Sequence, residues 1–307
     1  MVINRRKFLI KSGAATGLLA LSHFPFEAFA NGDIKRITIL HTNDQHSRIE
    51  PFEMDGGKYQ GQGGFANRAT VINKIRSEEK NVLLLDSGDI WQGTPYFNMY
   101  QGSLEFKLMS EMKYDASTIG NHDFDLGLEG FAKQLPLANF PFLCSNYDFE
   151  NTPLKDKTQP YKIFKVDEIK VGVFGLGIEL QGLVPKALYG ETVYQDPIAT
   201  ASKIATQLRN DYKCDLVICL SHLGYKYPNK KMSDIDLALN SSNIDLILGA
   251  HTHTFLPFPE EYKNAVGKKV IINQVGWAGI LLGRLDFYFE QKKKGVIVPD
   301  APIKIRS

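Results

Sequence analysis

Five short clusters of aspartate, asparagine and histidine stand at intervals along the chain. They read TNDQH (42–46), SGD (87–89), GNHD (120–123), SHLG (221–224) and GAHTH (249–253). Carboxylate oxygen, amide oxygen and imidazole nitrogen form a mixed hard and borderline ligand set, which suits Zn, Mn, Fe or Ni better than Ca or Cu(I). One cluster would mean little, because an isolated histidine or a Gly-Asp pair is usually a core residue or a turn. Five of them, each at the end of its own predicted strand, indicate a metal site.

Short β-rich runs alternate with longer stretches in which apolar residues recur every three or four positions. We predict strands at 35–41, 82–86, 115–119, 142–144, 161–166, 169–176, 215–220, 244–249, 270–275 and 281–289. We predict helices at 64–78, 103–113, 128–135, 197–212 and 232–240. This alternation favours an α/β or α+β sandwich in one domain, with sheets buried between helices. Loops 51–63 and 177–196 are long enough to be functional.

The positions of the clusters behind strands explain how segments far apart in sequence could meet. Ligands of α/β sheets bind in the crevice outside the carboxyl ends of the strands, where loops bring distant segments together. We therefore expect the clusters to line one edge of the sheets. His41 lies on a predicted strand before its cluster, so we expect it to be structural.

Residues 1–30 are predicted to be a twin-arginine signal peptide. Arg5-Arg6 is followed by Phe8-Leu9, then by a mild apolar stretch at 13–22, and Ala28-Phe29-Ala30 fits an A-x-A cleavage site. The apolar stretch is well short of the ~20 residues of a membrane span. We therefore predict export to the periplasm without a stable membrane anchor, and a catalytic domain over residues 31–307.

Charge and cysteine content exclude two further classes of protein. The chain has 36 Lys+Arg and 34 Asp+Glu, and its net charge falls from +2 to about −1 without the predicted signal peptide. Such a near-neutral chain lacks the excess of basic residues that attracts the phosphate backbone, so no nucleic-acid partner is expected. Cys144, Cys214 and Cys219 form no CxxC pair and are expected to be buried free thiols rather than a disulfide framework. Cys214 and Cys219 lie five residues apart in the run CDLVICL (214–220), which reads as one strand, so their side chains should point to opposite faces.

The clusters and the residues around them resemble a known family. The stretches that carry the resemblance are LHTNDQHS (40–47), LLDSGDIWQGTPYF (84–97), STIGNHDFDLG (117–127), SHLG (221–224), LGAHTHT (248–254) and NQVGWAGILLGRLDF (273–287). Together they resemble the calcineurin-like metallophosphoesterase superfamily and, within it, the catalytic domain of the 5'-nucleotidase family, over roughly residues 34–290. The resemblance implies a four-layer αββα sandwich with two divalent metal ions, Zn, Mn or similar, at one edge of the paired sheets.

The resemblance also implies which residues hold each metal. The first metal would be bound by Asp44, His46 and His253, the second by Asn121, His222 and His251, and Asp89 would bridge both. A bridging carboxylate is chemically reasonable, because two cations lie ~3.5–4 Å apart only if an anion shared between them screens their repulsion. Asn121 would add a neutral ligand and would also contact the substrate.

His122 and Asp125 resemble the catalytic dyad of the family. His122 would act on the phosphate and the leaving-group oxygen, while Asp125 would hold its tautomer and raise its basicity. A second interpretation of Asp125 is that it caps the following helix at its N-terminus.

The sequence departs from the family pattern in several places. Ser47 and Ala250 stand where relatives commonly have glycine, and Asp123 stands where they commonly have glutamate. Many relatives also carry a C-terminal domain that grips the nucleoside, and we expect that domain to be lacking because the sequence ends at Ser307. Local loops would then contact the substrate, with 56–64, 91–94 and Trp277 as the candidates.

The activity that the resemblance implies is release of phosphate from nucleotides or related phosphate esters by attack of a metal-activated hydroxide. Two alternatives stay open. One is a dimanganese enzyme that resembles the thiosulfohydrolases of sulfur oxidation. The other is a non-catalytic metal-binding subunit that works with a separately encoded nucleotide-binding chain.

Overall fold

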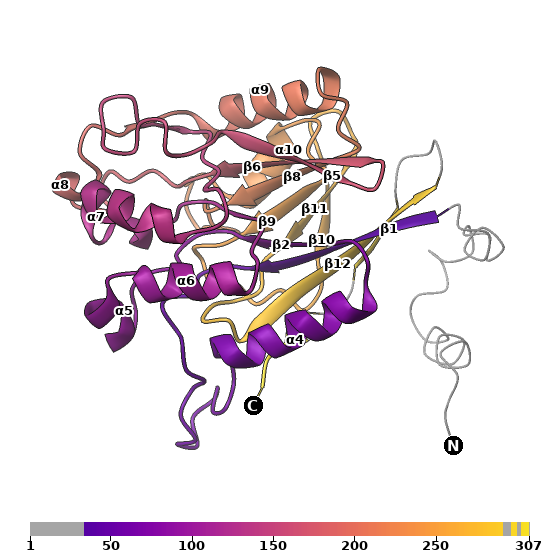
Figure 1. Ribbon diagram of the computed structural model, residues 1–307. Coiled ribbons are helices and arrows are strands. Elements are labelled where there is room, and N and C mark those ends of the chain that lie inside the picture. Colours follow the sequence, from indigo (N-terminus) through magenta and orange to yellow (C-terminus); the bar gives the residue numbers. More distant parts are fainter. Residues whose placement is uncertain (1–33, 291–295, 300–301, 307) are drawn as a thin grey trace, which may run out of the picture.

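The computed structural model describes residues 34–290, 296–299 and 302–306. Within them the chain forms two β-sheets packed face to face between two layers of helices, so the predicted four-layer sandwich is confirmed (Figure 1). The predicted signal peptide, residues 1–30, lies outside the described residues. No helix in the described part is long and apolar enough to cross a membrane.

The strands of the described residues form two six-stranded sheets and a small two-stranded ribbon. The first sheet has the order β13-β12-β1-β2-β3 with β14 also paired to β12, the second has the order β10-β11-β9-β8-β6-β5, and β4 pairs β7. The strands are β1 (Ile34–Thr42), β2 (Val82–Asp86), β3 (Ala116–Ser117), β4 (Tyr147–Asp148), β5 (Tyr161–Val166), β6 (Ile169–Leu176), β7 (Val193–Tyr194), β8 (Leu216–Ser221), β9 (Leu246–Gly249), β10 (Glu260–Lys263), β11 (Lys269–Asn273), β12 (Leu281–Glu290), β13 (Val296–Pro299) and β14 (Ile303–Lys304).

Helices cover the outer face of each sheet. They are α4 (Phe65–Glu78), α5 (Pro95–Tyr100), α6 (Ser103–Glu111), η1 (His122–Phe124), α7 (Gly127–Gln134), η2 (Leu135–Leu137), α8 (Lys186–Tyr189), α9 (Pro197–Asn210) and α10 (Asp234–Asn240). Helices α4 to α7 pack on the first sheet, and α9 and α10 pack on the second.

Apolar side chains that point alternately to the two faces of each sheet produce three separate apolar cores. Ile39 of β1 and Ile218 of β8 point into a core between the two sheets. The neighbouring side chains of the same strands point the other way, so that Leu40 packs under the helices of the first sheet and Cys219 under those of the second. Because successive side chains on a strand alternate between its faces, two buried faces per strand require nearly continuous apolar runs.

Each sheet contains a run of neighbouring parallel strands, which brings the ligand clusters to one place. β1, β2 and β3 run parallel in the first sheet, and β6, β8, β9 and β11 run parallel in the second. Their carboxyl ends therefore lie at a common edge of each sheet. The clusters that follow β1, β2, β3, β8 and β9 all emerge at this edge of the sandwich.

Most predicted elements are present, with ends that differ by a few residues. Residues 142–144 are an exception, because Phe142 and Leu143 make only isolated bridges to Ser117 and Gln159. The sequence interpretation missed α5, α8, η1, η2, β4, β7, β10, β13 and β14, most of which are short.

The three cysteines are buried and free, as predicted. The predicted opposite orientation of Cys214 and Cys219 is wrong. Cys214 lies in the turn before β8 rather than on the strand, and both thiols pack in the core under α9 and α10.

Arg209 in the last turn of α9 ties three segments of the second sheet together. Its Nη1 donates to the carbonyl oxygens of Cys214, at 2.7 Å, and Asp215, at 2.9 Å. Its Nη2 donates to the Asn243 carbonyl at 3.3 Å and forms an ion pair with Asp245. One guanidinium thus joins the end of a helix to the turns that precede β8 and β9.

We expect Arg209→Met to lower the free energy of unfolding by roughly 2–3 kcal/mol, because it removes the guanidinium that pairs with the largely buried Asp245 carboxylate and donates to the three carbonyl oxygens. Lys203→Met, on an exposed position of the same helix, should change it by less than about 0.5 kcal/mol. Urea unfolding of the two variants measures the difference. Equal midpoints would show that Arg209 does not hold these turns.

Candidate metal centre

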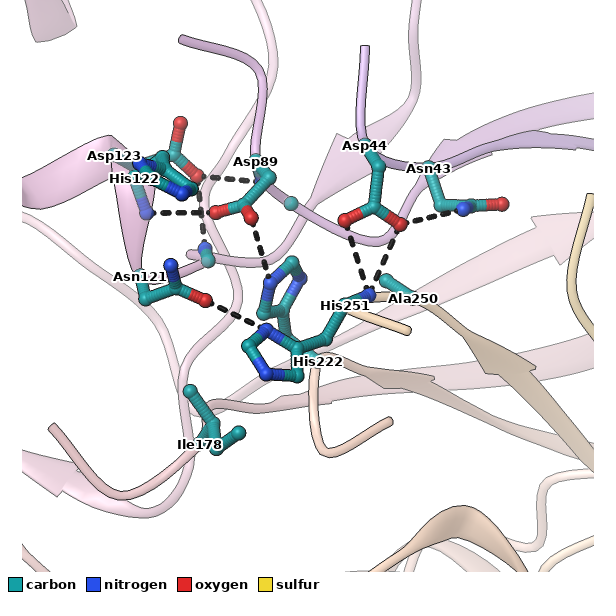
Figure 2. A network of polar contacts seen from close by, with 12 residues as sticks. Asn43, Asp44, Asp89, Asn121, His122, Asp123, Ile178, His222, Ala250 and His251 are labelled. Carbon is teal, nitrogen blue, oxygen red and sulfur yellow. Dashed lines mark hydrogen bonds and ion pairs between the residues drawn. The ribbon is translucent and has the colours of Figure 1, made fainter. Parts of the chain in front are cut away.

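The predicted ligands converge into two adjoining groups. Asp44, His46 and His253 form the first group, and Asp89, His222 and His251 form the second, with one ligand atom from each residue lying within 4.8 Å of the others in its group. Asn121 joins the second group, because its Oδ1 is 2.8 Å from Nδ1 of His251 (Figure 2). All seven predicted metal ligands are therefore brought together.

Asp89 lies between the two groups. Its Oδ2 is 3.1 Å from Nε2 of His222 in the second group and 3.9 Å from Nε2 of His46 in the first. Figure 2 shows the Asp89 carboxylate directed at the His222 ring. This position is the one that a carboxylate shared by two cations needs.

The backbone is left-handed at five of the seven ligands. The residues and their φ angles are Asp44 (48°), His46 (47°), Asp89 (54°), His251 (67°) and His253 (51°). Such a conformation costs of order 1–3 kcal/mol for each non-glycine residue, and it persists only where the surrounding structure holds it. Concentrated strain of this kind is typical of functional sites.

Backbone hydrogen bonds between two ligand loops hold this conformation. The amides of Asp44, His46 and Ser47 donate to the carbonyl oxygens of Gly88, Asp89 and Ile90, at 2.9, 3.0 and 2.9 Å. The loop at Gly88 also approaches the third strand so closely that a Cβ there would lie 2.6 Å from the Gly120 amide nitrogen. Glycine is therefore required at this approach.

The donor atoms fit a bound cation. Nε2 of His46 and Nε2 of His253 lie 3.0 Å apart, with Oδ1 of Asp44 3.4 Å from the second of them. Nε2 of His222 is buried without a well-aligned hydrogen bond. Lone pairs that converge in this way, with carboxylates beside them, are stabilised by a positive charge placed among them.

Carbonyl oxygens set the tautomers of two ligand histidines. Nδ1 of His222 is 2.7 Å from the Ser87 carbonyl, and Nδ1 of His46 is 3.3 Å from the Trp91 carbonyl. Because a carbonyl can only accept, each Nδ1 must carry the proton. Nε2 of each ring is then free to bind metal, as such outer hydrogen bonds arrange in metal sites generally.

The electrostatics of the second group also favour a cation. Burial opposes charge on His222, but the nearby Asp89 and Asp44 carboxylates prevail and raise its pKa to about 10. Burial alone would raise the pKa of Asp89, whereas His222 and His46 lower it overall. A positive charge between Asp89 and His222 is therefore favoured, and because imidazole binds metal in its neutral form, metal binding here should release a proton.

The predicted dyad lies beside both groups. Nδ1 of His122 is 3.1 Å from Oδ2 of Asp125, and this hydrogen bond is the main cause that raises the pKa of His122. The His122 amide donates to Oδ1 of Asp89 at 2.7 Å, and its ring centroid is 5.3 Å from that of His46. The helix-capping interpretation of Asp125 is wrong, because Leu126 is the N-cap of α7 and no side chain caps that helix.

Asp123 has a role that the sequence interpretation did not assign. Its buried carboxylate accepts four backbone amides, those of Asp89 (3.0 Å), Ile90 (3.0 Å), Trp91 (3.3 Å) and Gly120 (2.8 Å). It therefore fastens the loop that carries Asp89 to the loop that carries Asn121. The only signal for this role in the sequence was the departure from glutamate at this position.

The remaining sequence candidates divide into buried and accessible residues. His41 is fully buried on β1, where burial lowers its pKa to about 3, as expected of a structural residue. Trp91 is also fully buried, stacked on Phe106, so the prediction that it contacts substrate is wrong. Trp277 is half-buried and lies flat against His253, with ring centroids 5.6 Å apart and planes at 6°.

Known proteins are similar to this chain in sequence and fold. Residues 37–255 match the calcineurin-like phosphoesterase family. The chain is 35% identical to snake venom 5'-nucleotidase from Naja atra, over 87% of this chain and 53% of that protein. It is 30% identical to the 5'-nucleotidase of Vibrio cholerae, over 95% of this chain and 56% of that protein.

Among solved structures, the crystal structure of the 5'-nucleotidase precursor from Thermus thermophilus superimposes with a TM-score of 0.79 at 30% identity. The match covers 89% of this chain and 55% of that one. The chain thus spans about half the length of the relatives it matches.

We expect Asp89→Ala to lose both metals, because Oδ2 of Asp89 faces a histidine of each ligand group, His46 and His222. Asn121→Ala should weaken mainly the second metal. Elemental analysis after loading with Mn²⁺ or Zn²⁺ and gel filtration gives the stoichiometry, and Asp148→Ala, an exposed position outside both groups, is the control. Two equivalents of metal on Asp89→Ala would rule out its bridging role.

Proposed function

Because this chain belongs to the calcineurin-like phosphoesterase family, we propose that it is a two-metal phosphomonoester hydrolase of the 5'-nucleotidase type. The observation that carries the proposal is the His122–Asp125 pair, which stands beside both ligand groups without belonging to either. A subunit that only bound metal would have no use for this pair. Both relatives named above are 5'-nucleotidases, which favours phosphate esters over thiosulfate derivatives.

Under this proposal the first metal would be held by Asp44, His46 and His253, the second by Asn121, His222 and His251, and Asp89 would serve both. Two divalent cations here would supply Lewis acidity, polarising the phosphate oxygens and lowering the pKa of a water molecule. Zinc and manganese both suit the ligand set, since it mixes imidazole nitrogen with carboxylate and amide oxygen.

Asn121 and His122 would contact the substrate. Oδ1 of Asn121 is turned to His251, which leaves its Nδ2 free to donate to a phosphate oxygen. Asp125 holds Nδ1 of His122, so that Nε2 of the same ring is available to stabilise the phosphate and to give a proton to the leaving oxygen. The raised pKa of His122 favours the protonated ring that this step requires.

Nucleoside monophosphates are the first substrates that we propose, on the strength of the named relatives. We also propose that residues 1–30 direct export by the twin-arginine route and that 31–307 form the catalytic domain. The paired arginines and the A-x-A site support this assignment.

Removal of metal should abolish the activity. We expect the purified protein to release phosphate from AMP and from p-nitrophenyl phosphate, to lose this activity after dialysis against a chelator, and to regain it with Mn²⁺ or Zn²⁺. Circular dichroism before and after dialysis shows whether the chain stays folded. Full activity in protein shown by elemental analysis to be free of metal would contradict the proposal.

His122→Ala should keep both metals while kcat falls by about 10²–10⁴, the usual contribution of general acid–base catalysis and charge stabilisation. The loss should be smaller for p-nitrophenyl phosphate than for AMP, because p-nitrophenol leaves readily without a proton. Steady-state kinetics on both esters, with metal content measured on the same sample, make the comparison. An equal loss on both would show that His122 does not protonate the leaving oxygen.

A further inference from the structure

A cavity of about 300 Å³ lies between the β4–β7 ribbon, α8 and the loop that follows β6. Its lining residues are Tyr147, Glu179, Leu180, Gln181, Lys186, Tyr189, Thr192, Val193 and Tyr194. None of them belongs to the two ligand groups or to the dyad. Its volume is at the lower end of the range of small-molecule sites in proteins.

The cavity adjoins the candidate metal centre through two of its walls. The ring of Tyr147 packs against Phe124, which lies between His122 and Asp125 in the chain, with ring centroids 5.8 Å apart. The loop after β6 leaves the edge of the centre itself, because the Leu176 carbonyl accepts the His222 amide at 2.8 Å.

The same loop continues from the centre into the cavity. Ile178, labelled below Asn121 and His251 in Figure 2, follows Leu176 by two residues in this loop. The next residue, Glu179, already lines the cavity. The Tyr147 hydroxyl donates to the Ile178 carbonyl, which fixes the loop at the point where the two spaces meet.

The lining contains a buried polar group without a partner. Thr192 is 7% exposed, and its hydroxyl has no hydrogen-bond partner within the described protein. Buried polar groups almost always find a partner, and one that has none calls for an explanation. A ligand in the cavity that forms a hydrogen bond with the Thr192 hydroxyl would explain it.

The rest of the lining indicates the chemistry of that ligand. Three tyrosine rings, from Tyr147, Tyr189 and Tyr194, provide apolar surface with polar tips. Glu179 and Lys186 carry opposite charges and Gln181 an amide, so the cavity offers donors and acceptors without a strong net charge. Such a surface fits a neutral ligand that carries several hydroxyl groups.

We propose that this cavity binds the leaving group of the phosphate ester and selects one that bears hydroxyl groups, such as a sugar. This inference rests on the proposed function, because it assumes that the phosphate lies at the metal centre. The sugar then extends past His122 and Ile178 towards Thr192. A sugar phosphate or the ribose of a nucleotide has the required chemistry, and the two are distinguished by assay.

Ribose 5-phosphate and pentyl phosphate test the selection, because both are esters of primary alcohols with five carbon atoms and only the first bears further hydroxyl groups. We expect wild-type protein to prefer ribose 5-phosphate in kcat/KM. Thr192→Val should lower the ratio of the two kcat/KM values by about 2- to 10-fold, the usual effect of one neutral hydrogen bond. Thr200→Val, in α9 and away from the cavity, should leave the ratio unchanged.

Gln181→Trp is a second variant, at an exposed position of the cavity, where a bulky side chain should narrow it without disturbing the core. We expect KM for ribose 5-phosphate to rise with a smaller change in kcat. A ratio that stays at the wild-type value in both Thr192→Val and Gln181→Trp would overturn the proposal. AMP assayed beside ribose 5-phosphate shows whether a base adds to the preference.

A binding experiment separates failure of this inference from failure of the proposed function. Saturation-transfer NMR with adenosine needs no hydrolysis, and we expect transfer to the ribose protons in wild type and in His122→Ala but not in Gln181→Trp. If the protein binds adenosine in this way but releases no phosphate from any ester, the cavity is a binding site and the proposed phosphatase activity is refuted. Equal transfer in wild type and Gln181→Trp refutes the cavity assignment alone.

Discussion

Three backbone hydrogen bonds between the loops after β1 and β2 are the interaction on which the candidate metal centre depends. They join Asp44, His46 and Ser47 to residues 88–90, and they hold three ligands in left-handed conformations that an isolated peptide would avoid. A side chain on Gly88 would push these loops away from the third strand. The geometry of the ligands therefore follows from main-chain pairing before any metal arrives.

Buried polar groups beneath the loops keep them in place. Gln45 donates from Nε2 to Asp86 at 2.7 Å and accepts from Arg68 through Oε1, so its amide links a buried carboxylate to a buried guanidinium. The same carboxylate accepts the Thr42 hydroxyl at 2.6 Å and the Gly88 amide at 3.0 Å. An unpaired buried charge is costly, so this network has few alternative arrangements. It therefore restricts the loops above it to few conformations.

Much of this arrangement follows from the sequence, and the part that does not has identifiable causes. Parallel strands bring the residues after them to one edge, so the meeting of Asp44, Asp89 and His222 could be foreseen from their positions alone. The burial of Trp91 could not, because it depends on a distant glycine: a Cβ on Gly102 would lie 2.1 Å from the indole ring. The four amides bound by Asp123 were equally hidden, since spacing along the chain does not show which loops will lie within reach of one carboxylate. The export signal and the partner chain stay predictions.

Each ligand group draws side chains from both sheets. Asp44 and His46 follow β1 of the first sheet and His253 follows β9 of the second, while Asp89 and Asn121 face His222 and His251 across the same divide. The rest of the core between the sheets is mostly apolar, and apolar contacts are not directional. A metal bound by ligands from both sheets would cross-link the two halves of the sandwich. Occupancy and global folding would then be thermodynamically linked, by about 2.7 kcal/mol for each site at a metal concentration 100 times the dissociation constant. The layers of this protein would be locked together at the edge where its chemistry takes place.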